Sequence, residues 1–295
     1  MPTGWYNGAV EMKLPTSTHI AYYKDVGMNA IRLPIVWELI QPTLYGEFDA
    51  RYLGHVIEFL NSANVQGMKV VVDLHNYGRY REKLVGSPDV PAAAFTDLWR
   101  RLAGALSKHP AIYAFGLMNE PHNTGGLWHS VAQSGVNGIR SVDTTHLIYV
   151  AGDSWSNSQL WPTVNPEPFV SDPAGLIVYE AHIYFDDDFS GRYTSAVGNT
   201  DMTMRAAQRL QPFLSWLTKY SQKGVIGEVG VPMGDQRWLL ALQKFLEMSD
   251  GSCLDWFMWA GGAWRETYEL SLEPINGKDR PQIDVLRSWL IIHKH

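Results

Sequence analysis

The chain is poor in the residues that build several common kinds of protein. It has a single cysteine in 295 residues, Cys253, so it cannot form an internal disulfide or a cysteine-rich zinc or iron–sulfur site. It also lacks an apolar stretch of the ~20 residues that span a bilayer. The most apolar stretch, Cys253–Trp264, is interrupted by Asp255. Residues 1–15 lack the basic start and apolar centre of a secretory signal peptide.

Positive charge is scarce as well, which limits the possible partners. The chain has 24 Lys and Arg against 30 Asp and Glu, a net charge of −6 at pH 7. The basic residues form no run along the sequence. We therefore expect neither a nucleic acid nor an anionic membrane surface as a partner.

Apolar and aromatic residues, in contrast, are abundant. Hydrophobic residues make up 45% of the chain and charged residues 18%, a balance that excludes a disordered protein and predicts a large core. The 12 tryptophans and 14 tyrosines are more than a core requires, since leucine and valine can fill one. They indicate surfaces that stack on a flat ligand.

Short runs rich in β-branched residues alternate along the chain with amphipathic segments, and this alternation predicts the fold. The predicted strands are Ala30–Ile35, Lys69–His75, Ile112–Met118, His146–Ala151, Leu176–Tyr184, Gly224–Val231 and Cys253–Ala260. The predicted helices are Thr16–Gly27, Asp49–Val65, Pro88–Lys108, Trp128–Val142, Asp201–Tyr220, Gln236–Met248 and Gln282–Ile292. Strict alternation of strand and helix is typical of a parallel sheet with right-handed crossovers.

This pattern favours an α/β fold of the (β/α)8 TIM-barrel type. The strands recur roughly every 25–45 residues and no glycine-rich phosphate turn follows the first, which argues against a dinucleotide-binding fold. Residues 1–295 show no repeat or linker, so we predict a single domain with an irregular segment over residues 1–15. Only Trp5–Val10 could supply a strand before the Thr16 helix. The first barrel strand is therefore expected to be atypical or missing.

Functional residues of such barrels lie at the carboxyl ends of the strands. The residues at these ends are Arg32, His75, Asn119, Glu120, Asp153, Ser154, Trp155, His182, Tyr184, Glu228 and Trp259. Two of them, Glu120 and Glu228, are carboxylates flanked by apolar sequence, where an unpaired charge is costly. Their strands are predicted to lie on opposite sides of the barrel mouth. Two carboxylates that flank one bond are what glycoside hydrolysis requires.

Several segments together carry a family resemblance. They are Ile31-Arg32-Leu33-Pro34, Asp73-Leu74-His75-Asn76-Tyr77, Asn119-Glu120-Pro121, His182-Ile183-Tyr184, Gly227-Glu228-Val229-Gly230 and Trp259-Ala260-Gly261-Gly262. These segments resemble glycoside hydrolase family 5, and they occur in order from about Thr16 to the end of the chain. Trp37-Glu38-Leu39-Ile40-Gln41-Pro42-Thr43 is similar to a segment of the endoglucanases of that family. Six such segments in register are far more specific than any one alone.

The resemblance implies a retaining endo-β-1,4-glucanase, a cellulase that forms a covalent glycosyl-enzyme intermediate. It implies that Glu120 is the general acid and then the base, and that Glu228 is the nucleophile. Asn119 resembles the residue that bonds the 2-hydroxyl of the sugar. Arg32 and Tyr184 are expected to keep Glu228 ionised and oriented.

The resemblance also implies residues that surround the sugar. His75 and His182 resemble the pair that borders the site of the cleaved unit, and Trp259 resembles the platform beneath that sugar. Trp37 and Trp155 follow strand ends, where an indole face can stack on a pyranose ring.

The expected partner is a β-1,4-glucan polysaccharide, and no metal or other cofactor is implied. A polymer of this kind is too large to enter a cell, so we expect a secreted, extracellular protein. We also expect a monomer, and we expect residues 1–295 to contain no separate carbohydrate-binding module.

Other interpretations stay open at this point. A β-mannanase or a mixed-linkage β-glucanase shares the fold and the two carboxylates, and a catalytically silent carbohydrate-binding barrel would keep the tryptophans. A zinc site of His75, His182 and a glutamate is a less favoured alternative, because the neighbouring residues suit a sugar better. Trp161 and Trp264 are further candidate platforms. The tryptophans expected to pack against the barrel instead are Trp99, Trp216, Trp238 and Trp289.

Overall fold

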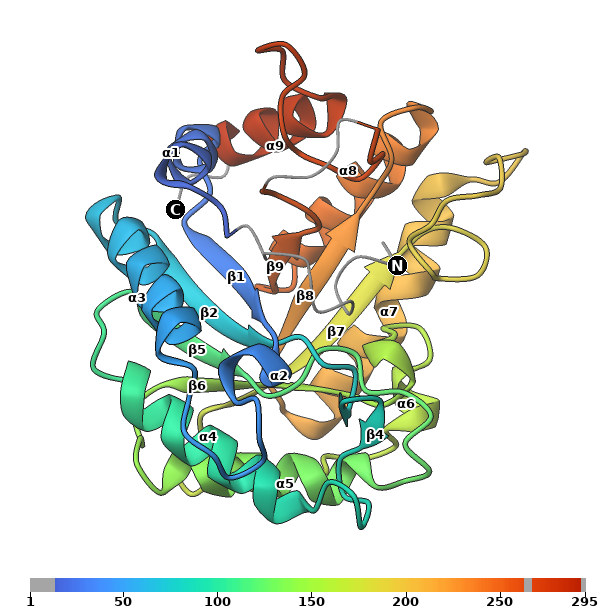
Figure 1. Cartoon of the computed structure of the whole chain (residues 1–295). Helices are drawn as coiled ribbons and strands as arrows, with labels where there is room; N and C mark the ends of the chain where they lie inside the picture. Colours follow the sequence, from blue (N-terminus) through green and yellow to red (C-terminus); the bar gives the residue numbers. More distant parts are fainter. Residues whose placement is uncertain (1–13, 263–266, 293–295) are drawn as a thin grey trace.

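The computed structural model describes residues 14–262 and 267–292. Seven parallel strands curve around a common interior, and helices surround them (Figure 1). In sheet order the strands are β1 (Ala30–Ile35), β2 (Lys69–Leu74), β5 (Ile112–Gly116), β6 (Leu147–Ala151), β7 (Ile177–Tyr184), β8 (Gly224–Gly230) and β9 (Asp255–Met258). Each of the seven predicted strands is confirmed. Within the described residues, the architecture is that of a (β/α)8 barrel of which seven strands are present.

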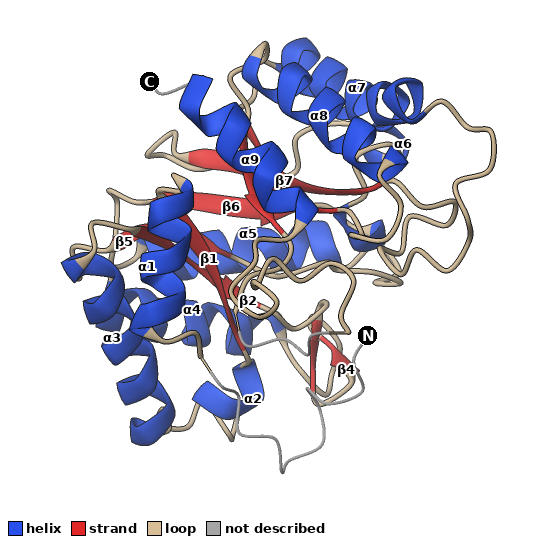
Figure 2. Cartoon of the chain, turned by 90° about the horizontal axis from the view of Figure 1, so that it is seen from above, coloured by secondary structure: helices blue, strands red, loops and turns tan. Residues whose placement is uncertain are grey.

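Helices cover the outer face of the sheet (Figure 2). The long helices are α1 (Ser17–Val26), α3 (Ala50–Val65), α4 (Ala92–Leu106), α5 (Trp128–Arg140), α7 (Met202–Tyr220), α8 (Arg237–Asp250) and α9 (Pro281–Ile292). The short elements are α2 (Trp37–Ile40), the hairpin β3 (Arg79–Tyr80) with β4 (Lys83–Leu84), η1 (Ser154–Ser156) and α6 (Trp161–Val164). The predicted helix starts are confirmed where an aspartate caps the helix. The carboxylate of Asp49 accepts from the backbone N–H of Tyr52, and that of Asp201 from the N–H of Met204.

The sheet ends on β1 at one side and on β9 at the other. In residues 14–262 and 267–292, β1 pairs with β2 and β9 pairs with β8, and no strand joins β1 to β9. The candidate first strand, Trp5–Val10, lies outside the described residues, so that prediction is not tested. None of the helices in the described ranges is both long and apolar enough to span a membrane.

The apolar residues of the strands divide between two cores, as expected for strands that are covered on both faces. Val70 and Val72 of β2 pack outward against the helices, whereas Val71 points into the barrel. The inner cluster also contains Tyr149 of β6 and Val225 of β8. The two faces of each strand are therefore filled, and polar side chains are confined to the strand ends and to a few interior positions.

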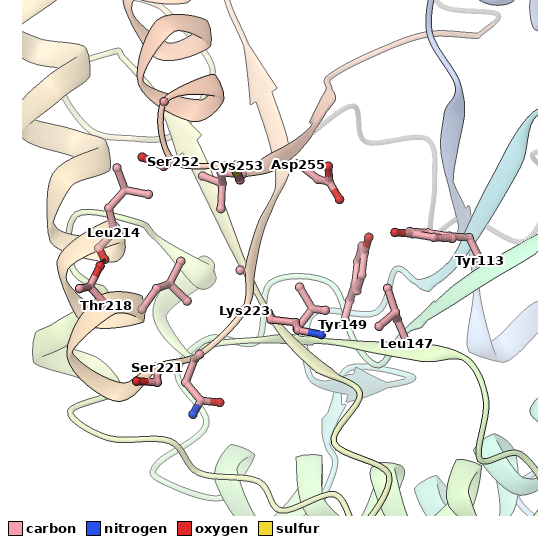
Figure 3. A pocket seen from close by; sticks show the side chains of 16 residues that line it. Tyr113, Leu147, Tyr149, Leu214, Thr218, Ser221, Lys223, Ser252, Cys253 and Asp255 are labelled. Carbon is pink, nitrogen blue, oxygen red and sulfur yellow. Dashed lines mark hydrogen bonds between the residues drawn. The ribbon is translucent and has the colours of Figure 1, made fainter. Parts of the chain in front are cut away.

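A cavity of about 700 Å³ opens at the amino ends of the strands (Figure 3). Its lining includes Tyr113, Tyr149, Lys223, Cys253 and Asp255. Lys223 and Asp255 lie at the starts of β8 and β9. Since all seven strands are parallel, this end of the barrel is opposite the carboxyl ends, where the candidate functional residues were predicted.

Close packing of α4 against α5 depends on a glycine. A Cβ atom at Gly138 of α5 would lie 2.6 Å from the backbone oxygen of Thr96 in α4, whereas one at Gly104 of α4 would meet nothing within 4 Å. We expect Gly138→Ala to lower the free energy of unfolding by about 1–3 kcal/mol, because the two backbones must move apart. Gly104→Ala should raise it by up to ~1 kcal/mol through helix propensity. Urea denaturation measures both, and stabilisation by both substitutions would contradict the packing described here.

Candidate active site

The carboxyl ends of the strands bring most of the predicted residues into one cluster. Strand β7 contributes Glu180, His182 and Tyr184, which alternate in sequence and therefore face the same side of the strand. The register between β7 and β8 places His182 opposite Glu228. Asn119 and Glu120 follow β5 directly. Side chains from distant parts of the chain thus meet because parallel strands end at one edge.

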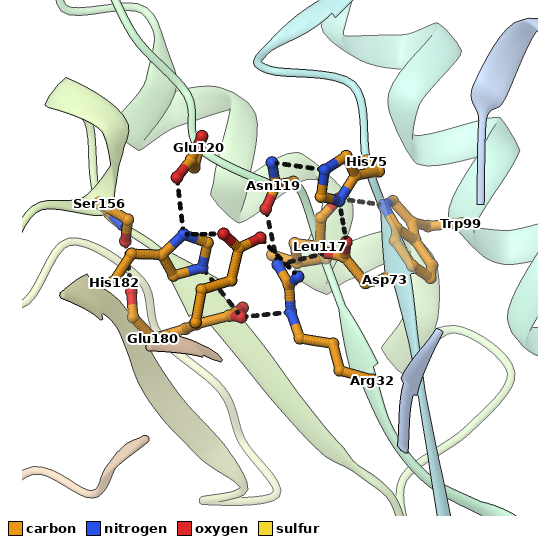
Figure 4. Close-up of polar contacts among 12 residues, drawn as sticks. Arg32, Asp73, His75, Trp99, Leu117, Asn119, Glu120, Ser156, Glu180 and His182 are labelled. Atoms are coloured by element: carbon orange, nitrogen blue, oxygen red, sulfur yellow. Dashed lines mark hydrogen bonds and ion pairs between the residues drawn. The ribbon is translucent and has the colours of Figure 1, made fainter. Parts of the chain in front are cut away.

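Arg32 of β1 lies at the centre of this cluster with 4% of its side chain exposed. Its guanidinium is 3.1 Å from Asp73 Oδ1, 2.7 Å from Glu180 Oε1 and 3.1 Å from Glu228 Oε1 (Figure 4). It also donates to Asn119 Oδ1 at 2.8 Å. Burial alone would lower the pKa of Arg32, but the three carboxylates outweigh burial and raise it. The guanidinium is therefore a permanent cation beneath the site.

Glu228 is held at both of its oxygens. Oε1 accepts from Arg32, and Oε2 accepts from the hydroxyl of Tyr184 at 2.6 Å. Burial and the charge of Glu228 raise the pKa of Tyr184 well above its usual value, so its hydroxyl stays protonated and donates. These two hydrogen bonds orient the carboxylate toward the barrel mouth.

Glu120 faces Glu228 across His182. Nδ1 of His182 lies 2.8 Å from Glu120 Oε1 and 3.5 Å from Glu228 Oε2. Potential ligand atoms of these three residues all lie within 4.8 Å of one another, so the two carboxylates are close neighbours. Burial lowers the pKa of His182, but Glu228, Glu120 and Glu180 raise it to about 10 overall. His182 therefore retains a proton at neutral pH.

His75 and Trp259 form the opposite border of the cluster. The two rings are parallel, with an angle of 5° and centroids 5.6 Å apart. Nδ1 of His75 lies 2.8 Å from Asp73 Oδ2, and the indole N–H of Trp259 donates to the hydroxyl of Tyr268 at 2.8 Å. Asn119 Nδ2 is 3.3 Å from His75 Nε2, which joins this border to the centre of the site.

Trp155 forms a second aromatic surface. It is 45% exposed and stacks on His122, with centroids 3.5 Å apart and an angle of 6°. Tyr77 meets the indole edge to face at 6.1 Å. Burial lowers the pKa of His122, which therefore stacks as a neutral imidazole. Trp155 lies next to the Glu120 loop, because its backbone N–H donates to the carbonyl of Pro121 at 3.0 Å.

Two of the predicted aromatic platforms are wrong. Trp37 is fully buried, packs edge to face against Tyr80, and donates its indole N–H to Gln41 Oε1. It belongs to the core, because the short helix α2 turns it away from the barrel mouth. Trp161 is also fully buried, and Trp264 lies outside the described residues. The predicted packing of Trp99, Trp216, Trp238 and Trp289 against the barrel is confirmed.

Sequence reasoning missed two residues of this region. Glu180 is fully buried beneath the cluster, and His122 supports Trp155. The pattern Glu180-x-His182-x-Tyr184 carries the signal for the first, because alternate residues of a strand share a face. The zinc alternative with His75 and His182 does not fit the geometry. Of the described residues, the group able to hold an ion is Glu120, His182 and Glu228, without His75.

Comparison with known proteins identifies the family. Residues 1–263 match the family described as Cellulase (glycosyl hydrolase family 5). The chain belongs to glycosyl hydrolase family 5. This membership confirms the resemblance seen in the sequence segments and makes the chain a glycoside hydrolase of the cellulase type.

Individual members of the family are similar over nearly the whole chain. A probable endo-beta-1,4-glucanase B from Neosartorya fischeri is 30% identical over 288 residues, which cover 95% of this chain and 84% of the relative. The crystal structure of Pseudomonas stutzeri endoglucanase Cel5A in complex with cellobiose is similar with a TM-score of 0.91 and 42% identity, covering 94% of this chain and 84% of that one. The endo-beta-1,4-glucanase Xac0029 from Xanthomonas axonopodis pv. citri has a TM-score of 0.86 and 33% identity, with 94% and 90% covered.

The buried charges at the centre of the site make a prediction about stability. We expect Arg32→Met to lower the free energy of unfolding at pH 7 by about 3–5 kcal/mol, because it leaves buried carboxylates without a cation. Arg32 lowers the pKa of Glu180 against the effect of burial. Without Arg32 that pKa rises, so the variant loses stability as the pH increases above the ordinary glutamate value of about 4.3. Urea unfolding should therefore show a smaller deficit at pH 4 than at pH 7.

Arg140→Met is the matched control. Arg140 is also buried and pairs with a single carboxylate, that of Asp172, at 2.8 Å. It should show the same direction of pH dependence with a smaller amplitude. An Arg32→Met deficit that is equal at both pH values would contradict the charge network described above.

Proposed function

We propose that this chain is a retaining endo-β-1,4-glucanase that cleaves cellulose-type β-glucans, with Glu228 as the nucleophile and Glu120 as the acid and base. The observation that carries the proposal is the spacing of the two carboxylates. Retaining glycosidases have carboxyl groups about 5–5.5 Å apart, whereas inverting enzymes need about 6.5–9.5 Å to admit a water molecule. The arrangement of Glu120, His182 and Glu228, with ligand atoms within 4.8 Å of one another, supports the retaining spacing.

The reaction proceeds in two displacements. In the first, an oxygen of Glu228 attacks the anomeric carbon, the glycosidic bond breaks, and Glu120 gives its proton to the leaving oxygen. In the second, Glu120 takes a proton from water, the water oxygen attacks the same carbon, and Glu228 is released. Arg32 and Tyr184 support the role of Glu228, because their hydrogen bonds fix both of its oxygens.

Hydrogen bonds and exposed rings support the binding of a sugar. The Asn119 amide is oriented by Arg32 and by His75, so it is pre-organised to bond a hydroxyl that gains hydrogen-bond strength in the transition state. Trp259 and Trp155 offer aromatic surfaces on which pyranose rings stack. Two such surfaces near the carboxylates suit a polymer that extends past the cleaved bond.

The substrate class follows from the family and its members. The similar enzyme from Pseudomonas stutzeri was crystallised with cellobiose, a β-1,4-linked disaccharide of glucose. A polymeric β-glucan is too large to cross a membrane, so we infer that the protein acts outside the cell. We infer that residues 1–295 act as one catalytic domain and as a monomer. A silent binding barrel is disfavoured because both carboxylates are present.

A panel of polysaccharides tests the substrate. We expect reducing-sugar release from carboxymethylcellulose, barley β-glucan and lichenan to exceed release from galactomannan by at least about tenfold, because the latter presents an axial 2-hydroxyl to the site. Higher activity on galactomannan than on every glucan would identify a β-mannanase. Activity on barley β-glucan and lichenan without activity on carboxymethylcellulose would identify a mixed-linkage glucanase.

Variants of the two carboxylates test their roles. Glu228→Ala should abolish turnover, and azide should restore some activity by attacking the anomeric carbon in the space left by the carboxylate. Glu120→Ala should reduce polymer hydrolysis by about 10²–10⁴-fold, the usual contribution of general acid catalysis. It should spare aryl glycosides with good leaving groups, which need no protonation.

Glu247→Ala serves as the control, since this glutamate is 64% exposed on helix α8 and should leave activity unchanged. Full polymer activity in either carboxylate variant would refute the assigned roles. Two results together would support Glu228 as the nucleophile. Azide would restore activity to Glu120→Ala, and Glu228→Ala would lose all hydrolysis of aryl glycosides.

A further inference from the structure

Glu180 is a buried carboxylate to which the proposed reaction assigns no role. Its side chain is fully buried on β7, and Figure 4 shows it next to His182 and Arg32. Its Oε1 atom lies 2.7 Å from Nε of Arg32 and 3.5 Å from Nε2 of His182. A buried carboxylate is costly unless cations compensate it. Its position therefore requires both of these neighbours, and both are parts of the site.

Each of these two neighbours touches a different carboxylate of the site. Arg32 contacts Glu228 at 3.1 Å, and Nδ1 of His182 contacts Glu120 at 2.8 Å. Glu180 is thus linked to Glu228 through Arg32 and to Glu120 through His182. One buried anion joins the two halves of the site.

The neighbouring strand makes room for this carboxylate. Gly227 of β8 lies beside Glu180, and a Cβ atom at position 227 would overlap Glu180 Oε1. The backbone φ of Gly227 is not positive. The lack of space beside Glu180 thus accounts for glycine at this position, immediately before Glu228.

We propose that Glu180 is a positioning residue that holds Arg32 against Glu228 and His182 against Glu120. The proposal rests on the function proposed above and deepens it. Glu180 does not contact the substrate, because it has no exposed surface. Its effect reaches the reaction through its two cationic partners.

The charged groups around His182 give the direction of the effect. His182 faces Glu180 on its own strand, Glu228 on β8 and Glu120 after β5, while Arg32 of β1 compensates Glu180 and Glu228. On the η1 side, uncharged Asn157 and Ser158 contact it through the backbone. Glu180 is one of three anions that raise the pKa of His182. Loss of this charge lowers that pKa, so His182 releases its proton at a lower pH.

Glu180→Gln tests the proposal, because it removes the charge and keeps the size of the side chain. We expect kcat at pH 7 to fall by at least about tenfold while KM changes little, since the effect falls on the chemical step. The basic limb of the pH profile should move to lower pH by about one unit or more. Glu180→Asp retains the charge, so its basic limb should stay near that of the wild type even where kcat is reduced.

Asp172→Asn is the matched control. Asp172 is a buried carboxylate, 1% exposed, that pairs with Arg140 away from the site. It should lose stability without a change in the basic limb. If Glu180→Gln folds and its limb coincides with those of the wild type and of this control, Glu180 is merely structural and the proposal is overturned. If Glu180→Gln does not fold, Glu180→Asp becomes the test. This variant retains the charge, so a basic limb that shifts in it by as much as the loss of a charge would produce also overturns the proposal.

A measurement without substrate separates this proposal from the proposed function. NMR titration of labelled histidine should show His182 of the wild type protonated through about pH 8, given its pKa of about 10. In Glu180→Gln it should titrate at a lower pH. An unchanged titration would overturn the role of Glu180. A wild type that hydrolyses no β-glucan would refute the proposed function, whatever the titration shows.

Discussion

The structure depends on one buried cation, Arg32, which links β1 to its partner β2 and also to β7 and β8, with which β1 does not pair. Its guanidinium joins β1 to Asp73 of β2, to Glu180 of β7 and to Glu228 of β8. In the described ranges β1 is an edge of the sheet, so this contact across the interior holds that edge to the opposite wall. Only a planar guanidinium presents donors in several fixed directions at once. Buried ion networks of this kind contribute less to stability than to the specificity of one conformation. Here that conformation fixes the positions of the reacting groups.

The balance of charge around that cation explains how an acid and an anion coexist within one site. Two cationic groups, Arg32 and His182, face the carboxylates of Asp73, Glu120, Glu180 and Glu228. Burial lowers the pKa of His182, but the surrounding carboxylates outweigh burial and raise it, so His182 stays protonated. The direct donors to Glu228 are Arg32 and Tyr184, whereas Glu120 faces Nδ1 of His182. The proton of His182 therefore lies on the Glu120 side of the site, where the proposed reaction needs an acid.

The strands and the two facing carboxylates could be predicted from the sequence, because both follow from local rules. Apolar β-branched runs form the strands, and charged residues such as Glu120 and Glu228 at their carboxyl ends must meet at one edge. The direction of a side chain after a strand end could not be predicted in this way. Trp37 was assigned to the site although helix α2 turns it into the core. Glu180 was overlooked because it lies inside a strand, where only the alternation with His182 reveals its direction.

The aromatic surface at Trp155 is connected to the same charge network by strained backbone. Ser154, Trp155 and Ser156 have φ values of 54°, 61° and 55°, a conformation that is unfavourable for non-glycine residues. Such strain persists only where the surroundings hold it. Here the N–H of Trp155 donates to Pro121 beside Glu120, and the hydroxyl of Ser156 donates to the backbone oxygen of Glu180. The loop that presents the indole is therefore anchored next to Glu120 on one side and to Glu180 on the other, so the indole and these two carboxylates are fixed relative to one another before a ligand binds.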